Sequence, residues 1–272
     1  MTPRHLLDTA DPVAAFAAAR RAGELVALPT SGTSGTVRTV VRTTASWVDS
    51  FAAVSELAGL DAAARVWIPG PLTATMNLFA AVHADAVGAV RVPTLAAATH
   101  AQLTPSALHR LLEEEVDLQG RTVVIAGDAL APGLRRRAEA AGARVEHYYG
   151  AAELSFVGWG TDASTLRPFP GVDVALRDGE LWARSAFVCR DVEGTPGPFR
   201  RAGDDFATVG DRGRLDGQTL IVTGRGDAVI TAGATVISAD VEAVLRPALA
   251  GQVVVLGLPH PRLGAVVVAV LT

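Results

Sequence analysis

Apolar residues recur with helical and with strand-like spacing in alternation over the first 150 residues of the chain. β-branched runs are typical of strands, whereas apolar residues three and four positions apart are typical of helices. The expected helices are residues 11–22, 44–60, 76–89, 104–115 and 132–142. The expected strands are residues 24–29, 37–44, 67–70, 91–93, 121–127 and 144–150. This alternation predicts an α/β domain with a largely parallel sheet and flanking helices.

The spacing changes after Gly150 to short strands and tight turns. Asp-Gly pairs within residues 172–185 and 214–224 predict hairpins, so this part is expected to be an antiparallel β subdomain. Residues 237–249 have helical spacing, and residues 253–272 read as two buried strands around a turn.

A boundary is expected at the Gly-Arg-Gly-Asp stretch. We therefore expect a large domain over residues 1–224, followed by the hinge and a short, incomplete α+β subdomain over residues 225–272.

Composition excludes several classes of protein. A chain of 272 residues with 49% hydrophobic residues can bury a large core, and its net charge of -4 argues against a nucleic-acid partner. The single cysteine, Cys189, suits a reducing compartment, and the N-terminus lacks the apolar core of a signal peptide, so a cytoplasmic protein without a membrane partner is expected. All 24 basic residues are arginine, which excludes chemistry that requires an ε-amino group.

The loop after the first expected strand is rich in hydroxyl groups and glycine. It comprises Thr30, Ser31, Gly32, Thr33, Ser34 and Gly35. Glycine lets the backbone approach a phosphate chain closely, and hydroxyl and amide groups donate to phosphate oxygens. The loop is not a Walker motif, because the Lys-Ser/Thr pair is missing, and loops of this composition are also ordinary connectors.

Three further segments carry side chains that suit a nucleotide. Tyr148 and Tyr149 end a buried strand, where an aromatic ring can stack on a base, and Glu153 follows with a carboxylate suited to Mg²⁺. Asp211 can accept from ribose hydroxyls, and Arg225 can reach ribose or phosphate. Each of these signals is weak alone, since a turn aspartate or arginine is usually solvated surface.

Six motifs in order make the chain resemble the adenylate-forming superfamily, which comprises acyl- and aryl-CoA ligases, peptide-synthetase adenylation domains and luciferases. The motifs are TSGTSG at 30–35, AGDALAP at 126–132, YYGAAE at 148–153, VGDRGRLD at 209–216, GRGDAVITAGATVISADVEAVL at 224–245 and GLPHPRLG at 257–264. Among its members, the chain looks most similar to compact o-succinylbenzoate-CoA ligases.

The resemblance implies ATP-dependent activation of a small carboxylic acid to an acyl adenylate, followed by thioester formation. It implies ATP, Mg²⁺ and CoA, with a carrier-protein thiol as the other acceptor, and it leaves a homodimer open. The implied ATP site consists of residues 30–35 with Gly127, Asp128, Ala129, Tyr148, Tyr149, Gly150, Ala152, Asp211 and Arg225. The implied catalytic residues are Thr33, Arg38 and Glu153, with Glu153 on the metal, Asp227 at the hinge and Gly233 near the thiol.

Departures from the family pattern concern charge and hydrogen bonding. Arg38 stands where the phosphate loop usually has lysine, and Ala152 replaces a hydroxyl residue before Glu153. Residues 70–76 lack the family's aromatic or histidine turn, and the family's adenylation lysine would follow Thr272. We therefore expect ATP and acid to bind while adenylation is slow.

The acid pocket is expected from residues 73–79, the strand before Gly127 and residues 156–160. These are mostly apolar, which favours an aryl or aliphatic acid. The alternative is a degenerate relative that binds nucleotide or acyl ligand without efficient turnover. A hydrolase is disfavoured because glycine does not follow Ser34 by two residues.

Overall fold

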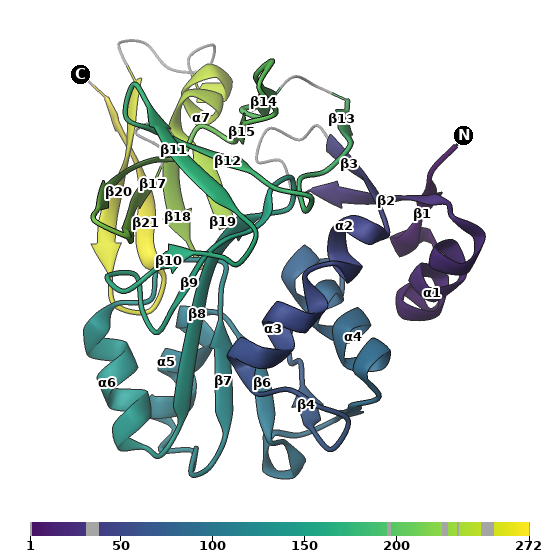
Figure 1. The fold of residues 1–272 in the computed structure, drawn as a ribbon. Helices are drawn as coiled ribbons and strands as arrows, with labels where there is room; N and C mark the ends of the chain where they lie inside the picture. The colour runs from purple at the N-terminus through teal and green to yellow at the C-terminus, as the bar shows by residue number, and fades with distance from the viewer. Residues whose placement is uncertain are drawn as a thin grey trace.

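A seven-stranded sheet in the order β10-β9-β8-β7-β6-β4-β5 lies at the centre of the computed structural model (Figure 1). Its strands are β4 (Arg65–Trp67), β5 (Val90–Val92), β6 (His100–Leu103), β7 (Thr122–Ile125), β8 (Arg144–Ala151), β9 (Ser155–Gly160) and β10 (Arg167–Pro168). Strands β4 to β8 pair in parallel, whereas β9 and β10 pair antiparallel. The structure describes residues 2–30, 38–194, 197–224, 228–232, 234–245 and 253–271.

Helices cover both faces of this sheet. Helices α3 (Phe51–Ala58) and α4 (Thr75–Val87) lie on one face, and α5 (Pro105–Glu113) and α6 (Pro132–Ala140) lie on the other (Figure 1). Because successive strand residues point to opposite faces, β7 sends Val124 into the cluster with α3 and α4 and Ile125 into the cluster with α5 and α6. The expected largely parallel sheet with flanking helices is confirmed.

Helix α1 (Pro12–Ala22) begins and ends as its sequence predicts. The carboxylate of Asp11 accepts from the backbone N–H groups of Val13 and Ala14 at 3.0 and 3.1 Å. Gly23 ends the helix in the left-handed conformation, with φ of 65°. The helix lies beside a four-stranded sheet of β1 (Arg4–His5), β2 (Leu25–Thr30), β3 (Arg38–Thr43) and β13 (Asp191–Glu193).

The part after β10 is mainly antiparallel, as expected. One sheet contains β11 (Asp173–Arg177), β12 (Glu180–Arg184), β14 (Arg200–Arg201), β15 (Ala207–Thr208), β16 (Arg212–Asp216) and β17 (Thr219–Gly224). Asp178 and Gly179 turn between β11 and β12 with φ of 52° and 78°, which is the geometry that favours Asp-Gly. A further sheet contains β18 (Ala228–Thr231), β19 (Ala234–Ile237), β20 (Val253–His260) and β21 (Gly264–Leu271), beside α7 (Ser238–Leu245).

Two local predictions are wrong, and one strand was not predicted. The helix expected over residues 44–60 is two helices, α2 (Ala45–Val48) and α3, because the Ser50 hydroxyl donates to the Trp47 carbonyl at 2.7 Å and competes with the helical backbone. The strand expected at 67–70 ends at Trp67, before Pro69. Strand β6 was not expected, since two of its four residues, His100 and Gln102, are polar.

The strands expected at the end of the chain are present but are not both buried. Val253 and Val255 are buried, whereas the alternate residues Val254, Leu256 and Leu258 are 45%, 37% and 50% exposed. This alternation shows that one face of β20 packs against the protein and the other does not. The domain boundary near residue 225 falls outside the described residues and stays a prediction. Within the described ranges, no helix combines the length and apolar character needed to span a bilayer.

Candidate functional site

Two neighbouring strand ends carry the residues expected to face adenine. Gly127, Asp128 and Ala129 follow β7, and Tyr148, Tyr149 and Gly150 belong to β8. Because β7 and β8 are parallel neighbours, their carboxyl ends meet at one edge of the sheet. In open α/β sheets, this is the edge at which ligands bind.

Gly127 occupies a position at this edge that a larger residue would not fit. Its φ is 88°, and a Cβ added there would lie 3.2 Å from the sulfur of Met76. The next residue, Asp128, accepts from the Ala129 N–H at 2.6 Å, and partial burial raises the pKa of its carboxyl. Glycine therefore fits at this position because it has no side chain to press on Met76.

Tyr149 and Asp211 are in direct contact. The Tyr149 hydroxyl donates to Asp211 Oδ2 at 2.7 Å, across 62 positions of sequence. The Asp211 carbonyl in turn accepts from the Leu181 N–H at 2.8 Å. Two expected nucleotide ligands are thus brought together, with the carboxylate held at a defined position between the central sheet and the antiparallel sheet.

Tyr148 belongs to a different compartment from Tyr149. Its ring stacks on Trp159 with centroids 5.6 Å apart and planes 15° apart, and it contacts Phe156 at 4.7 Å. Burial raises the pKa of its phenol above the ordinary value. The structure therefore places this tyrosine in an aromatic cluster that also lines a cavity.

Glu153 lies in the turn after β8 beside a buried arginine. It is 9% exposed, and its carbonyl accepts from the Cys189 N–H at 2.7 Å. Arg42 on β3 is fully buried, and its Nη2 donates to the carbonyls of Ala152 and Phe187 at 3.1 and 3.3 Å.

Arg42 stays positively charged in this environment. Burial lowers the pKa of Arg42 to about 10, while the carboxylate of Glu153 acts to raise it. Its carbon Cζ lies 5.3 Å from the Trp47 ring centroid. Among the described residues, Nε and Nη1 of Arg42 have no hydrogen-bond partner. A buried positive charge therefore lies next to the Ala152 carbonyl and the Glu153 carboxylate.

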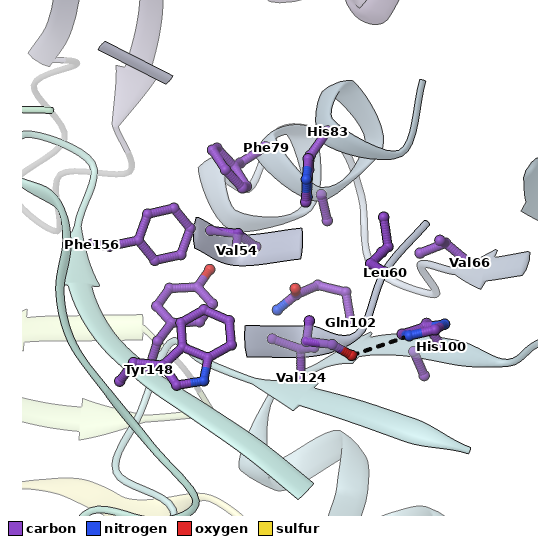
Figure 2. A pocket seen from close by; sticks show the side chains of 14 residues that line it. Val54, Leu60, Val66, Phe79, His83, His100, Gln102, Val124, Tyr148 and Phe156 are labelled. Atoms are coloured by element: carbon purple, nitrogen blue, oxygen red, sulfur yellow. Dashed lines mark hydrogen bonds between the residues drawn. The ribbon is translucent and has the colours of Figure 1, made fainter. Parts of the chain in front are cut away.

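A narrow cavity lies between the sheet and helices α3 and α4 (Figure 2). Its walls include Val54, Phe79, Val124, Phe156 and Trp159, and the space left for the centre of a water molecule is about 30 Å³. All three regions expected to form the acid pocket contribute to it, namely residues 73–79, the strand before Gly127 and residues 156–160. Its polar lining residues include His83, His100 and Gln102.

Several expected site residues lie outside the described part of the structure. They are Ser31, Gly32, Thr33, Ser34, Gly35, Arg225, Asp227 and Gly233, together with the side chain of Thr30. Arg38 is described: it begins β3, and its guanidinium packs against Gly197, which has no side chain to obstruct it.

Two residues of interest were missed from the sequence. Arg42 lies in a β-branched run that reads as an ordinary strand, and Gln102 lies in the unexpected strand β6. A polar residue in an otherwise apolar stretch is the available signal, and it does not show whether that side chain faces a cavity, a partner or solvent.

Comparisons with known proteins agree with this geometry. The model of a family described as AMP-binding enzyme matches residues 19–190. The 2-succinylbenzoate-CoA ligase of Escherichia coli K12 is 29% identical over 145 residues, which cover 51% of this chain and 32% of the ligase. The chain thus spans about a third of the length of this curated relative.

Solved structures share the fold over most of the chain. An amide bond synthetase from Marinactinospora thermotolerans aligns with a TM-score of 0.75 and 26% identity, covering 90% of this chain and 58% of the synthetase. A malonyl-CoA ligase with methylmalonyl-CoA and AMP bound aligns with a TM-score of 0.76 and 21% identity, covering 91% of this chain and 63% of the ligase. The mixed α/β fold is therefore that of adenylate-forming enzymes.

Proposed function

Because the chain belongs to the AMP-binding enzyme family, we propose that it binds ATP and a small carboxylic acid and joins them into an acyl adenylate. A thiol, either CoA or that of a carrier protein, then accepts the acyl group. The similarity to a 2-succinylbenzoate-CoA ligase and the shared fold of a malonyl-CoA ligase support this class of reaction.

The observation that carries the proposal is the position of two consecutive tyrosines on β8. Tyr148 lines the apolar cavity, and Tyr149 holds Asp211 at 2.7 Å. The body of the acid lies against the aromatic wall to which Tyr148 belongs, and Asp211 accepts from the ribose hydroxyls. One strand therefore brings the two substrates to the same sheet edge, as an in-line displacement requires.

The nucleotide contacts follow from the strand ends. The exposed backbone of Gly127 and Ala129, with Asp128 between them, forms one side of the adenine site. The hydroxyl-rich loop at residues 30–35 follows β2 and receives the phosphates, with Arg38 at the start of β3 supplying positive charge. Arg225 makes the second ribose contact.

Mg²⁺ fits the donor present at Glu153. Mg²⁺ usually takes one or two protein carboxylates together with substrate phosphates, and Glu153 is a buried carboxylate in a turn at the sheet edge. When bound, Mg²⁺ would neutralise charge on the phosphates. Arg42 holds the backbone of this turn through the Ala152 carbonyl.

In the reaction, a carboxylate oxygen bonds to the α-phosphorus and the bond from that phosphorus to the pyrophosphate oxygen breaks. Two anions must meet, so fixed positive charge stabilises the transition state. The chain contains no lysine, and arginines therefore supply this charge within it. We expect adenylation to be slow compared with nucleotide binding, because arginine replaces lysine imperfectly.

ATP–pyrophosphate exchange with a panel of aryl and aliphatic acids tests the proposal. We expect acid-dependent exchange that Glu153→Gln lowers by at least tenfold, since the neutral amide loses the metal's carboxylate. Glu56→Gln, an exposed position on α3, is the matched control and should leave exchange unchanged. Exchange by Glu153→Gln at the wild-type rate would rule out the assigned metal role.

A second function is favoured by Ala152, which supplies no hydroxyl to the α-phosphate. On this alternative, the chain binds nucleotide or acyl ligand without efficient turnover. Isothermal titration separates the two: tight ATP binding without exchange for any acid supports the binding protein. Restoration of exchange by Ala152→Thr would instead support an enzyme that has lost one donor.

A further inference from the structure

Asp211, the residue assigned to the ribose, lies in a turn between two strands of the antiparallel sheet (Figure 1). Strand β12 pairs with β15 through Ala183 and with β16 through Glu180. Residues 209–211 connect β15 to β16, and Gly210 turns the chain with φ of 79°. Because this connection lies outside the strands, other groups must bond to its buried backbone.

The hydroxyl of Thr208 makes two of these bonds. Thr208 is fully buried, its Oγ1 donates to the Leu181 carbonyl at 2.7 Å, and the same oxygen accepts from the Gly210 N–H at 3.0 Å. A hydroxyl both donates and accepts, so one side chain satisfies a carbonyl and an N–H in the interior. The Leu181 N–H donates to the Asp211 carbonyl at 2.8 Å. Both backbone groups of Leu181 therefore hold the turn that ends at Asp211.

Thr208 is itself held in place by the residues on either side of it. Ala207 and Val209 are both buried, and Ala207 lies opposite Ala183 in the pairing of β15 with β12. Asp211, in contrast, is partly exposed. The turn thus connects a packed segment to a carboxylate that a ligand can reach, and the Thr208 hydroxyl bonds to both the turn and β12.

Two separate sets of contacts determine the position of the Asp211 carboxylate. Tyr149 on the central sheet bonds to the side chain at 2.7 Å, whereas Leu181 bonds to the backbone of Asp211 and Thr208 bonds to the turn before it. Without the Thr208 hydroxyl, the Leu181 carbonyl and the Gly210 N–H would each lose a partner, and the turn would rearrange to replace these bonds. A ligand would then have to order Asp211 as it binds, which weakens binding.

We propose that Thr208 is a positioning residue of the ribose site: its hydroxyl fixes the turn that carries Asp211 and thereby strengthens the preference for nucleotides that have ribose hydroxyls. This inference rests on the proposed function, which assigns Asp211 to the ribose. Thr208 does not touch the nucleotide, since it is fully buried and acts through the backbone of Gly210 and Leu181.

The ratio of two dissociation constants tests this role. The full chain is titrated by calorimetry with Mg-ATP and with the magnesium complex of dideoxy-ATP, which lacks both ribose hydroxyls. We expect the wild type to bind ATP at least about tenfold more tightly, as hydrogen bonds to a charged group allow. Thr208→Val keeps the shape of the side chain but removes its hydroxyl. In this variant, the dissociation constant for ATP should rise roughly threefold to tenfold, while that for dideoxy-ATP should change by less than about twofold.

Further variants separate positioning from a purely structural role. Thr208→Ser keeps the hydroxyl and should keep the wild-type ratio, whereas Thr208→Ala should lower it as Thr208→Val does and replaces that variant if it does not fold. In Asp211→Ala, the ratio should fall toward one, and adding Thr208→Val should change it no further.

Ser50→Ala is the matched control. Ser50 is also fully buried, and its hydroxyl also donates to a carbonyl, that of Trp47, at 2.7 Å. Urea unfolding should show a loss of stability similar to that of Thr208→Val, because each variant removes a buried hydrogen bond of the same kind. The ratio of the two dissociation constants should nevertheless stay at the wild-type value in Ser50→Ala.

A wild-type ratio in folded Thr208→Val, an equal fall of the ratio in Ser50→Ala, or equal binding of both nucleotides by the wild type overturns the inference. Adenylate formation is measured separately by trapping with hydroxylamine. If adenylate forms and Thr208→Val keeps the wild-type ratio, the proposed function stands and the role of Thr208 is wrong. If the ratio falls as expected but no acid gives an adenylate, the proposed chemistry fails and positioning by Thr208 stands. A wild type that does not bind ATP refutes both.

Discussion

Tyr149 donates its phenolic hydrogen bond to Asp211 at 2.7 Å, which joins the edge of the central sheet to the segment that follows β15. The two residues come from motifs 62 positions apart. The contact fixes one carboxylate oxygen and leaves the carboxylate oriented before any ligand arrives. Preorganisation of this kind lowers the cost of binding.

Removal of the phenolic hydroxyl should weaken nucleotide binding. In Tyr149→Phe, Asp211 loses one donor and with it part of its orientation, so we expect the dissociation constant for Mg-ATP to rise about twofold to tenfold. Titration calorimetry measures the change. Tyr148→Phe, at the adjacent position, should leave Mg-ATP binding unchanged, and an equal effect of both variants would contradict the assignment.

Arg42→Met should destabilise the protein by roughly 2 to 4 kcal/mol, because the carbonyls of Ala152 and Phe187 each lose a charged donor in the interior. Urea unfolding measures the free energy. Arg91→Met, on an exposed position of β5, is the control and should change stability by less than about 0.5 kcal/mol. Similar midpoints for the two variants would show that the buried guanidinium contributes nothing net.

Stability should depend on pH through His83 and His147. Burial lowers the pKa of each ring to about 4 in the folded protein, against an unfolded value of about 6.5. Between these two pKa values, the unfolded state therefore binds more protons than the folded state. The free energy of unfolding keeps its full value above about pH 6.5 and falls as the pH drops toward 4.

Each histidine should contribute on the order of 2 to 3 kcal/mol to this loss across the window. Urea unfolding at a series of pH values measures it. In His83→Gln, which can still bond to the Ser55 hydroxyl, the slope against pH should be smaller by up to one proton. An unchanged slope would mean that His83 is already protonated in the folded protein.

Gly150 should not tolerate a side chain. A Cβ there would collide with the Ser155 carbonyl oxygen, where the pairing of β8 with β9 shifts register. We expect Gly150→Ala to lower the unfolding free energy by about 1 to 3 kcal/mol. Gly133→Ala in α6 meets nothing within 4 Å and should raise it by up to about 1 kcal/mol. Stabilisation by both substitutions would exclude the collision.

Most strands of the parallel sheet could be predicted from the sequence, because each is a run of apolar residues that is recognised without knowledge of its neighbours in space. Strand β6 could not be found in this way, since the buried ring of His100 has its Nε2 at the carbonyls of Ala58 and Gly59, more than 40 positions away. The order of six motifs identified the candidate nucleotide residues.

What the motifs could not provide is how distant segments meet. Arg42 donates to carbonyls 110 and 145 positions further along the chain. The sequence next to Arg42 therefore does not predict its environment. The environment of Gln102 also comes from distant segments, so its sequence neighbours did not predict it. Gln102 lines a cavity whose other walls include residues of α3, α4, β4, β7, β8 and β9.

Tyr148 and Tyr149 are joined by one peptide bond, yet they contact different compartments. On the proposed function, the separation between acid and ribose therefore depends on the spacing of adjacent Cα atoms in a strand, which the trans peptide bond fixes at about 3.8 Å. Mutations elsewhere can reshape either compartment without altering this distance. Because the strand fixes the distance between the two compartments, substitutions in the compartment walls can change substrate preference while the positions of the reacting atoms stay the same.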